Sequence, residues 1–189
     1  FVNTPIPNAF ATGRNPQNAV VAVTAGIMET LDDQELYAVL AHEIGHIKNY
    51  DMLVSTIAAS LGGAISYLAQ MAFYFGGNDE ESPNPIAMIA MMILAPLAAT
   101  LIQLAVSRTR EFGADDHSKK ITHGDGRALA SALQKLESIK PQLKNYQPSP
   151  AEQNTAHLMF TNMFNLQGIS ALFSTHPSTK ARVERLVNK

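Results

Sequence analysis

The chain contains no cysteine and no tryptophan among its 189 residues, and only 16% of them are charged. Without cysteine there are no disulfides and no thiolate ligands, so any metal ion must be bound by His, Asp or Glu. A formal net charge of -2 offers no basic surface for nucleic acid, which is not expected as a partner. The 46% of hydrophobic residues can bury a substantial core, which predicts a single domain over residues 1–189.

Two histidines four residues apart enclose a glutamate in the segment His42-Glu43-Ile44-Gly45-His46. Residues four apart share a face of an α-helix, so His42 and His46 can both bind one tetrahedral Zn²⁺. Glu43 points about a quarter turn away, where it can reach a water on the metal. Zinc lowers the pKa of such a water to about 7, and Glu43 can accept its proton. The pattern predicts one hydrolytic zinc site per chain; the alternative is a chance match on a surface helix.

The helix that carries this motif has a predicted start, because Asp32 and Glu35 have capping-box spacing. His42 and His46 lie largely off the apolar stripe of this helix, as a cleft-facing pair would. Gly45, which costs up to about 1 kcal/mol relative to Ala in a helix, indicates close approach of another backbone. The stripe predicts a buried side formed by Leu36, Val39, Leu40, Ile44 and Ile47.

Upstream of this helix the sequence indicates a β-hairpin. A short strand from Asn8 to Thr12 precedes a turn-rich segment from Gly13 to Asn18 and an apolar run from Ala19 to Val23. Prolines flank the first strand and cannot donate to a β-ladder, so this strand is expected at a sheet edge. Such an edge could bind an extended substrate by β-augmentation; an ordinary framework hairpin is the alternative. The substrate-binding candidates are Asn8, Ala9, Phe10, Ala11 and Thr12.

Two long runs, from Met52 to Gly77 and from Ile86 to Ser107, contain no charged residue. Each exceeds the roughly 20 residues that a membrane-spanning helix needs. The short connection between them is acidic, whereas basic residues flank their outer ends, in agreement with the positive-inside rule. We expect a membrane-spanning or membrane-associated helical hairpin at residues 53–107. Two buried helices of a soluble domain are the alternative.

Directly after the second run, Glu111 and Asp115 stand four residues apart and share a helical face. Glu111 completes a His₂Glu zinc site with one position open for water, and Asp115 can accept the spare N–H of a ligating histidine. For this segment alone, a solvated helix with ion pairs is the alternative. The extended metzincin pattern is excluded, since it requires histidine where the chain has Met52. Glu137 and Glu152 are weaker candidates, because neither has a carboxylate four residues on.

The C-terminal third contains one further candidate, His176, directly before Pro177. If Pro177 lies at a helix start, His176 could stabilise the oxyanion of a tetrahedral intermediate or take the fourth zinc position; a surface histidine is the alternative. Before it, residues 126–139 predict an amphipathic helix, residues 141–150 a proline-rich loop, and residues 151–173 a mildly helical segment that packs in the core.

Four segments together resemble the HtpX membrane metalloproteases, within the larger group that includes prenyl-protein CAAX proteases and mitochondrial quality-control proteases. The resemblance extends nearly end to end and implies an α+β fold that is mainly α with a small β-hairpin, a zincin-like metallopeptidase domain with a long apolar helical hairpin. The segments are Asn8-Ala9-Phe10-Ala11-Thr12-Gly13, His42-Glu43-Ile44-Gly45-His46, Glu111-Phe112-Gly113-Ala114-Asp115, and Ser174-Thr175-His176-Pro177 followed by Arg182.

The resemblance implies roles for individual residues. It implies that Zn²⁺ is bound by His42, His46 and Glu111 and that Glu43 is the catalytic base. It places His176, the histidine before Pro177, near the metal as a catalytic residue. It also implies that Arg182 supports the loop of His176 or the carbonyls of the substrate.

The resemblance also implies a zinc endopeptidase of the bacterial inner membrane, with its catalytic side facing the cytoplasm. Its expected partners are the lipid bilayer and polypeptide substrates, namely damaged or misassembled membrane proteins cleaved in a stress response. HtpX proteins carry two transmembrane segments before the catalytic region, so the chain is expected to be a fragment. A soluble zinc peptidase and a catalytically silent, zinc-binding membrane scaffold are the competing functions.

Overall fold

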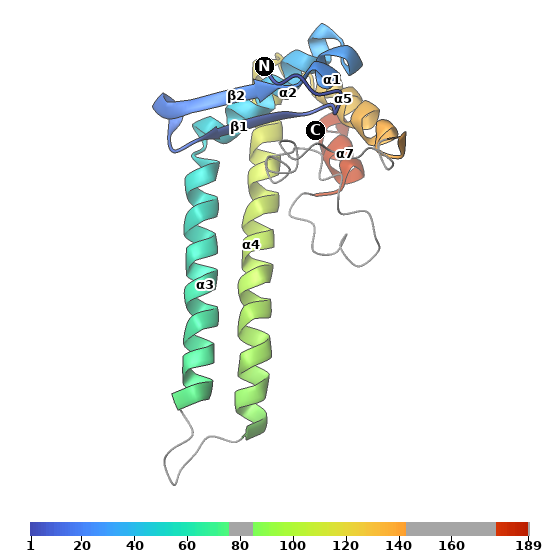
Figure 1. Ribbon diagram of the computed structural model, residues 1–189. Helices are drawn as coiled ribbons and strands as arrows, with labels where there is room; N and C mark the ends of the chain where they lie inside the picture. Colours follow the sequence, from blue (N-terminus) through green and yellow to red (C-terminus); the bar gives the residue numbers. More distant parts are fainter. Residues whose placement is uncertain (76–84, 143–176, 189) are drawn as a thin grey trace.

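Two long helices carry a small domain at one end (Figure 1), in a computed structural model that describes residues 1–75, 85–142 and 177–188. The expected class, mainly α with one β-hairpin and a long apolar helical hairpin, is confirmed. In chain order the elements are β1 (Ala9–Gly13), a 3-10 turn (Pro16–Asn18), β2 (Ala19–Val23), α1 (Ala25–Thr30), α2 (Asp33–Lys48), α3 (Asp51–Phe75), α4 (Pro85–Ile121), α5 (Arg127–Ile139) and α7 (Thr179–Asn188).

β1 and β2 pair antiparallel, and the predicted hairpin is confirmed with its first strand one residue later than expected. The backbone N–H of Thr24 donates to the carbonyl of Asn8 at 3.0 Å. The peptide groups of Asn8 and of every second residue after it therefore point toward β2. Among the described residues, no strand pairs with the outer edge of β1. The peptide groups that point to this outer edge are those of Ala9, Ala11 and Gly13.

α2 begins with the predicted capping box. The Asp32 carboxylate accepts from the backbone N–H of Glu35 at 2.9 Å, and the Glu35 carboxylate accepts from that of Asp32 at 3.0 Å. The predicted buried stripe is wrong at Ile44, which is 39% exposed. A Cβ on Gly45 would lie 3.0 Å from the Cα of Ala114, so α4 crosses α2 in backbone contact. Small residues therefore occupy the buried face: Ala38, Ala41 and Gly45, together with Val39 and His42.

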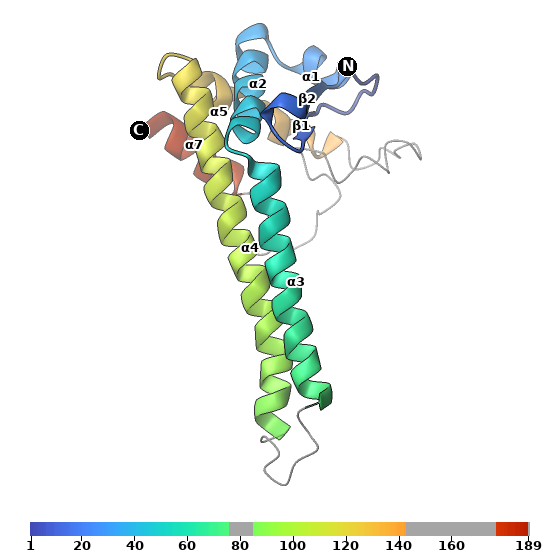
Figure 2. The same ribbon diagram turned by 90° about the vertical axis from the view of Figure 1, so that its left-hand side faces the viewer.

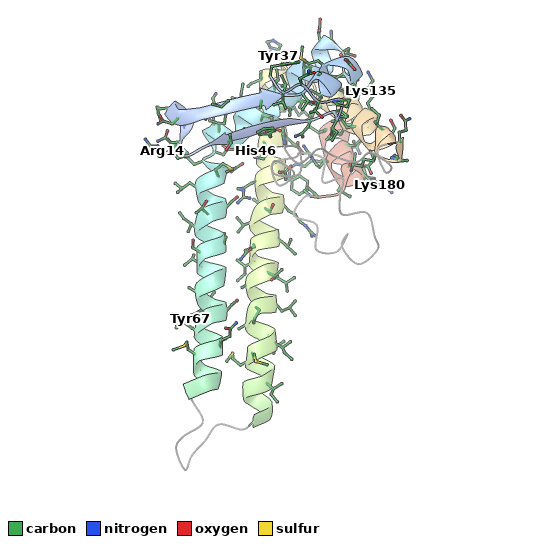
Figure 3. All side chains as sticks on the ribbon, in the orientation of Figure 1. Arg14, Tyr37, His46, Tyr67, Lys135 and Lys180 are labelled. Carbon is green, nitrogen blue, oxygen red and sulfur yellow. The ribbon has the colours of Figure 1, made fainter. Side chains whose placement is uncertain are left out.

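α3 and α4 run side by side away from the rest of the molecule (Figures 1 and 2). Asp51–Ala72 and Ile89–Ile121 are long and apolar enough to cross a membrane, and only 11% of the most apolar window of each is buried. Tyr67, which is 61% exposed, projects outward from α3 (Figure 3). Such exposure does not match the alternative of two helices buried in a soluble core. α4 continues without a break from the apolar run through the segment that contains Glu111.

The hydrophobic core lies between α2 and the elements β1, α1, α5 and α7. The predicted amphipathic helix at residues 126–139 is confirmed as α5, with Gly126 as its N-cap. This core fixes the position of α2, and with it the face of α2 that points toward α4. The core residues are Ala9, Ile27, Leu31, Ala38, Val39, Leu129, Ala130, Ala132, Leu133, Leu136 and Leu186.

Candidate metal centre

His42 and His46 of α2 face Glu111 of α4, and one ligand atom from each lies within 4.8 Å of the others. The Nε2 atoms of the two histidines are 3.1 Å apart. The Glu111 carboxylate oxygens lie 3.7 Å from Nε2 of His42 and 3.5 Å from Nε2 of His46. Zinc bonds of about 2.0–2.2 Å in a tetrahedron separate the ligand atoms by about 3.3–3.6 Å. The spacing of the three side chains therefore fits a zinc ion.

A carboxylate lies behind each histidine. Nδ1 of His42 is 2.9 Å from Oδ1 of Asp115, and Nδ1 of His46 is 2.6 Å from Oδ2 of Asp51. Each carboxylate accepts the Nδ1 proton, which turns Nε2 of both rings toward Glu111 as the atom available for a metal. Burial and, to a lesser extent, the charge of Arg182 together lower the pKa of His42 to about 4. His42 is therefore neutral, as a metal ligand must be.

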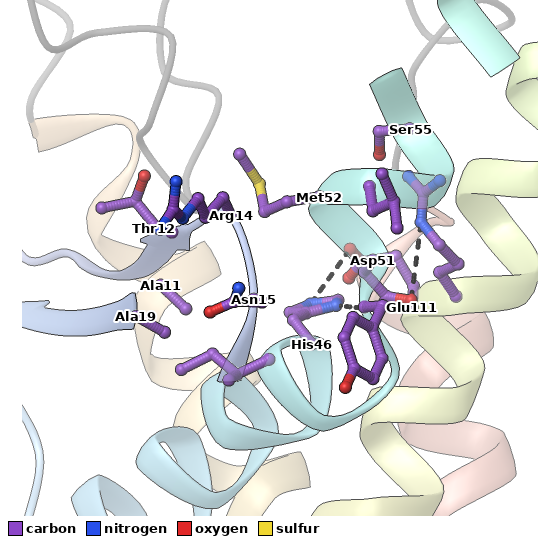
Figure 4. A pocket seen from close by; sticks show the side chains of 15 residues that line it. Ala11, Thr12, Arg14, Asn15, Ala19, His46, Asp51, Met52, Ser55 and Glu111 are labelled. Carbon is purple, nitrogen blue, oxygen red and sulfur yellow. Dashed lines mark hydrogen bonds and ion pairs between the residues drawn. The ribbon is translucent and has the colours of Figure 1, made fainter. Parts of the chain in front are cut away.

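The surroundings of His46 favour positive charge. Burial alone would lower the pKa of His46, but its hydrogen bond to Asp51 and the charges of Glu111 and Glu43 raise that pKa overall. Without metal, a proton on Nε2 supplies this charge; a divalent cation shared by the three side chains would supply it in the proton's place. Figure 4 shows His46 between Asp51 and Glu111.

Glu43 lies one residue after His42 and is almost completely buried. Its Oε2 accepts a hydrogen bond of 3.0 Å from the backbone N–H of Ala11, which ties it to the outer edge of β1. Its Oε1 is also buried, and no described residue donates a hydrogen bond to it. The pKa of Glu43 is raised to about 7, chiefly by burial and also by the charge of Glu111, against the opposing charge of His46. Glu43 can therefore exchange a proton near neutral pH.

Arg182 enters the centre from α7 and is 4% exposed. Its guanidinium donates to both oxygens of Asp115, at 3.0 Å from Nε and 2.6 Å from Nη2, and its Nη1 lies 3.4 Å from Oε2 of Glu111. The structure thus places Arg182 against the carboxylates of α4. His176 lies outside the described residues. The competing candidate Glu137 lies on α5, bound to Lys140 and Thr179, and Glu152 is also outside the described residues.

Sequence reasoning missed Asp51, which is 6% exposed and opens α3. Tyr50 has a φ of 56° and forms the turn between α2 and α3, which folds Asp51 back onto His46. Arg110 lies on the other side of Asp51, with its Nε 3.9 Å from Oδ1. The sequence signal for Asp51 was its position directly before the long uncharged run. That run contains no charged residue to pair with it, so its partner had to lie elsewhere in the fold.

These features define a class: an α+β domain with a candidate His₂Glu metal site of the kind found in zinc metallopeptidases. The chain belongs to peptidase family M48, whose model matches residues 1–189. The resemblance to HtpX proteins is confirmed. The chain is 53% identical to a protease HtpX homolog of Sulfurihydrogenibium sp., covering 96% of this chain and 64% of that protein. It is 52% identical to a protease HtpX homolog of Persephonella marina, covering 97% of this chain and 65% of that protein.

The chain thus spans about 65% of the length of these relatives. Its fold is similar to that in the crystal structure of S. mikatae Ste24p, with a TM-score of 0.56 and 23% sequence identity. The similarity covers 96% of this chain and 42% of that chain.

Proposed function

We propose that this chain carries the catalytic site of a zinc-dependent endopeptidase that acts on polypeptides at a membrane. The observation that carries the proposal is the position of Glu43, which is held by the N–H of Ala11 next to the His42, His46 and Glu111 cluster. Membership of peptidase family M48 supports the reaction class.

The proposed zinc ligands are His42, His46 and Glu111, oriented by Asp115 and Asp51. When bound, zinc supplies a Lewis acid that polarises the scissile carbonyl and lowers the pKa of the attacking water. Asp115 and Asp51 keep the Nδ1 protons in place, so that Nε2 of each ring stays directed at the centre.

Glu43 is the proposed general base. Its Oε1, which accepts no hydrogen bond from the described residues, takes the proton of the attacking water and passes it to the leaving amine. Such acid–base catalysis contributes typically about 10²- to 10⁴-fold. Arg182 balances the negative charge of Asp115 and Glu111. For His176 we retain the proposal that it stabilises the oxyanion or takes the fourth zinc position.

The outer edge of β1 is the proposed binding site for the substrate backbone, with Asn8, Ala9, Phe10, Ala11 and Thr12 in this segment. On this edge the peptide groups of Ala9, Ala11 and Gly13 point away from β2. Ala9 is buried, so an added strand would pair with the partly exposed segment from Ala11 to Gly13. The N–H of Ala11 already points from this edge to Glu43, so a substrate strand paired here would pass the reacting groups.

α3 and α4 are the proposed anchor in the bacterial inner membrane, with the catalytic side facing the cytoplasm. Their exposed apolar surface and the basic residues at the domain end of the hairpin support this orientation. The substrates we propose are damaged or misassembled membrane proteins, in a quality-control role during stress.

The substitution Glu43→Gln tests the mechanism. Because glutamine keeps the shape of the side chain but cannot accept the proton, Glu43→Gln should bind about one zinc per chain and lose at least about 10²-fold in the rate of casein cleavage. Zinc content is measured by elemental analysis and cleavage by fluorescence of labelled casein. Glu29→Gln, at an exposed position of α1, is the matched control and should retain full activity. Cleavage by Glu43→Gln at the wild-type rate would eliminate this mechanism. A zinc-loaded wild type that cleaves nothing would favour the silent scaffold.

A further inference from the structure

A pocket of about 170 Å³ opens beside the candidate metal centre (Figure 4). One wall is the end of β1 with the start of the β1–β2 loop, residues 11–15. The second wall contains His46 and Glu111, and the third is the first turn of α3. The proposed mechanism assigns no role to this pocket, although it begins where the outer edge of β1 ends.

A strand that adds to the outer edge of β1 would cross the mouth of this pocket. Ala11 lines the pocket, and its backbone N–H also donates to Glu43. The pocket and the proposed catalytic base therefore meet at the same residue of this edge. Successive side chains of a strand point to opposite faces. A residue that flanks the cleaved bond would therefore direct its side chain into the pocket.

Most of the surface of the lining is apolar, although Arg14 and Arg110 are part of it. Ile47, Met52 and Leu53 line it, and the latter two are 44% and 48% exposed. Figure 4 shows Met52 extending from the first turn of α3 toward Arg14 of the loop. The two carboxylates of the lining are already engaged, Asp51 by His46 and Glu111 by the histidines and Arg182. A cavity of about 150 Å³ lined by apolar side chains accepts benzene, so a volume of this size suits the side chain of leucine, methionine or phenylalanine.

We propose that this pocket is a specificity subsite that accepts a large apolar side chain of the substrate next to the cleaved bond, with Met52 as the residue that determines the preference. This inference rests on the proposed endopeptidase function. Because Met52 belongs to the first turn of α3, the subsite lies where the domain meets the apolar hairpin.

The first test maps cleavage sites of a random peptide library by mass spectrometry, with the zinc-loaded full chain in detergent. The wild type should enrich Leu, Met and Phe at one position within two residues of the cut. Met52→Lys should lower this preference about tenfold or more and enrich Asp and Glu at the same position. A gain of acidic preference cannot arise from a folding defect. Met28→Lys, at a residue that is 50% exposed on α1 and outside the pocket, should leave the wild-type pattern unchanged.

The second test separates binding from cleavage. In the Glu43→Gln background, fluorescence anisotropy compares one peptide carrying Leu at the mapped position, or at the centre if no cut is found, with its Asp counterpart. The Leu peptide should bind at least about tenfold more tightly, and adding Met52→Lys should reverse the order. Cleavage without a positional preference, together with equal binding of the two peptides, overturns the subsite and leaves the endopeptidase function intact. Absent cleavage with Leu-selective binding that Met52→Lys reverses overturns the endopeptidase function but supports an apolar side-chain site.

Discussion

Asp51 and Asp115 stand in equivalent positions, one behind each histidine of the candidate metal centre. A carboxylate that fixes the tautomer and orientation of a ligating imidazole typically contributes 10- to 100-fold to metal affinity. We therefore expect Asp51→Ala to weaken zinc binding by about 10- to 100-fold. Asp51→Asn should weaken it less, because the amide oxygen can still accept the Nδ1 proton of His46. Competition with a chromophoric chelator measures both affinities.

Asp33→Ala is the matched control for this prediction. Asp33 is an exposed carboxylate in the first turn of α2, far along the helix from the histidines, so zinc affinity should not change. Equal zinc affinity of Asp51→Ala and the wild type would show that His46 needs no partner at Nδ1.

The residues of the candidate centre differ in how visible they are in the sequence. His42 and His46 follow from spacing within one helical turn, whereas Glu111 was assigned from its spacing with Asp115 and from the resemblance to HtpX proteins. Asp51 was missed because its contact with His46 depends on the turn at Tyr50, whose positive φ no pattern announces. The contact between Arg182 and Asp115 joins residues 67 apart, and only the docking of α7 creates it. The functional roles of all these residues stay predictions.

The side chain of Glu35 links the start of α2 to α5. Glu35 accepts from Lys135 Nζ and from Ser131 Oγ, both at 2.6 Å, in addition to its capping bond to Asp32. Burial alone would raise the pKa of Glu35, but these three hydrogen bonds outweigh it and lower the pKa below its usual value. Since the folded state holds the ionised form, Glu35 stabilises the fold above pH 4.5, and this contribution is lost as the pH falls through the folded pKa.

Glu35→Gln should therefore lower the free energy of unfolding by about 1.5–3 kcal/mol at neutral pH, the range for hydrogen bonds to charged groups. Glutamine retains the capping position but not the charge facing Lys135. As the pH falls below 4.5, the difference from the wild type should shrink, because the wild-type carboxyl also becomes neutral. Urea unfolding followed by circular dichroism, in detergent with excess chelator, measures the difference at each pH. A difference that stays constant from pH 7 to pH 3 would contradict this account.

Elements with a clear hydrophobic periodicity or a capping pattern were predictable from the sequence. Features that depend on tertiary packing were not. α2 begins at the predicted capping box, and α5 matches the amphipathic pattern predicted over residues 126–139 within one residue. α1 was missed, because six residues are too few to show a helical period. The exposure of Ile44 was also unpredictable, since it results from the close crossing of α4 at Gly45, which turns the small residues of α2 inward.

The whole molecule combines a small domain with an apolar helical hairpin of comparable extent (Figure 2). Both the candidate zinc ligand Glu111 and the carboxylate Asp51 lie where these helices enter the domain, at the domain end of α4 and α3. If the hairpin lies in a bilayer, as we propose, the metal centre sits next to the membrane surface. Any change in how the helical hairpin is oriented in the bilayer would then also change the positions of His46 and Glu111.

The environment of the hairpin can be tested with substitutions at exposed positions. Leu61 and Leu101 are 60% and 53% exposed. In water, replacing either by arginine would be nearly neutral, as for most surface substitutions. In a bilayer, each arginine near the middle of a span costs about 2.5–3.5 kcal/mol. We therefore expect Leu61→Arg/Leu101→Arg to reduce the share of protein that stays in membranes after alkaline carbonate extraction, as measured by immunoblot.

Val20→Arg provides the comparison, because Val20 is 64% exposed and belongs to β2, not to the helical hairpin. This variant also introduces an arginine at an exposed apolar position, and Val20 is more exposed than Leu61 or Leu101. Its membrane retention should match that of the wild type. If the double variant is retained like the wild type, the exposed leucines do not contact lipid. A wild type that is also monodisperse without detergent would then favour the soluble zinc peptidase, because water would be the only solvent left for the exposed surface of α3 and α4.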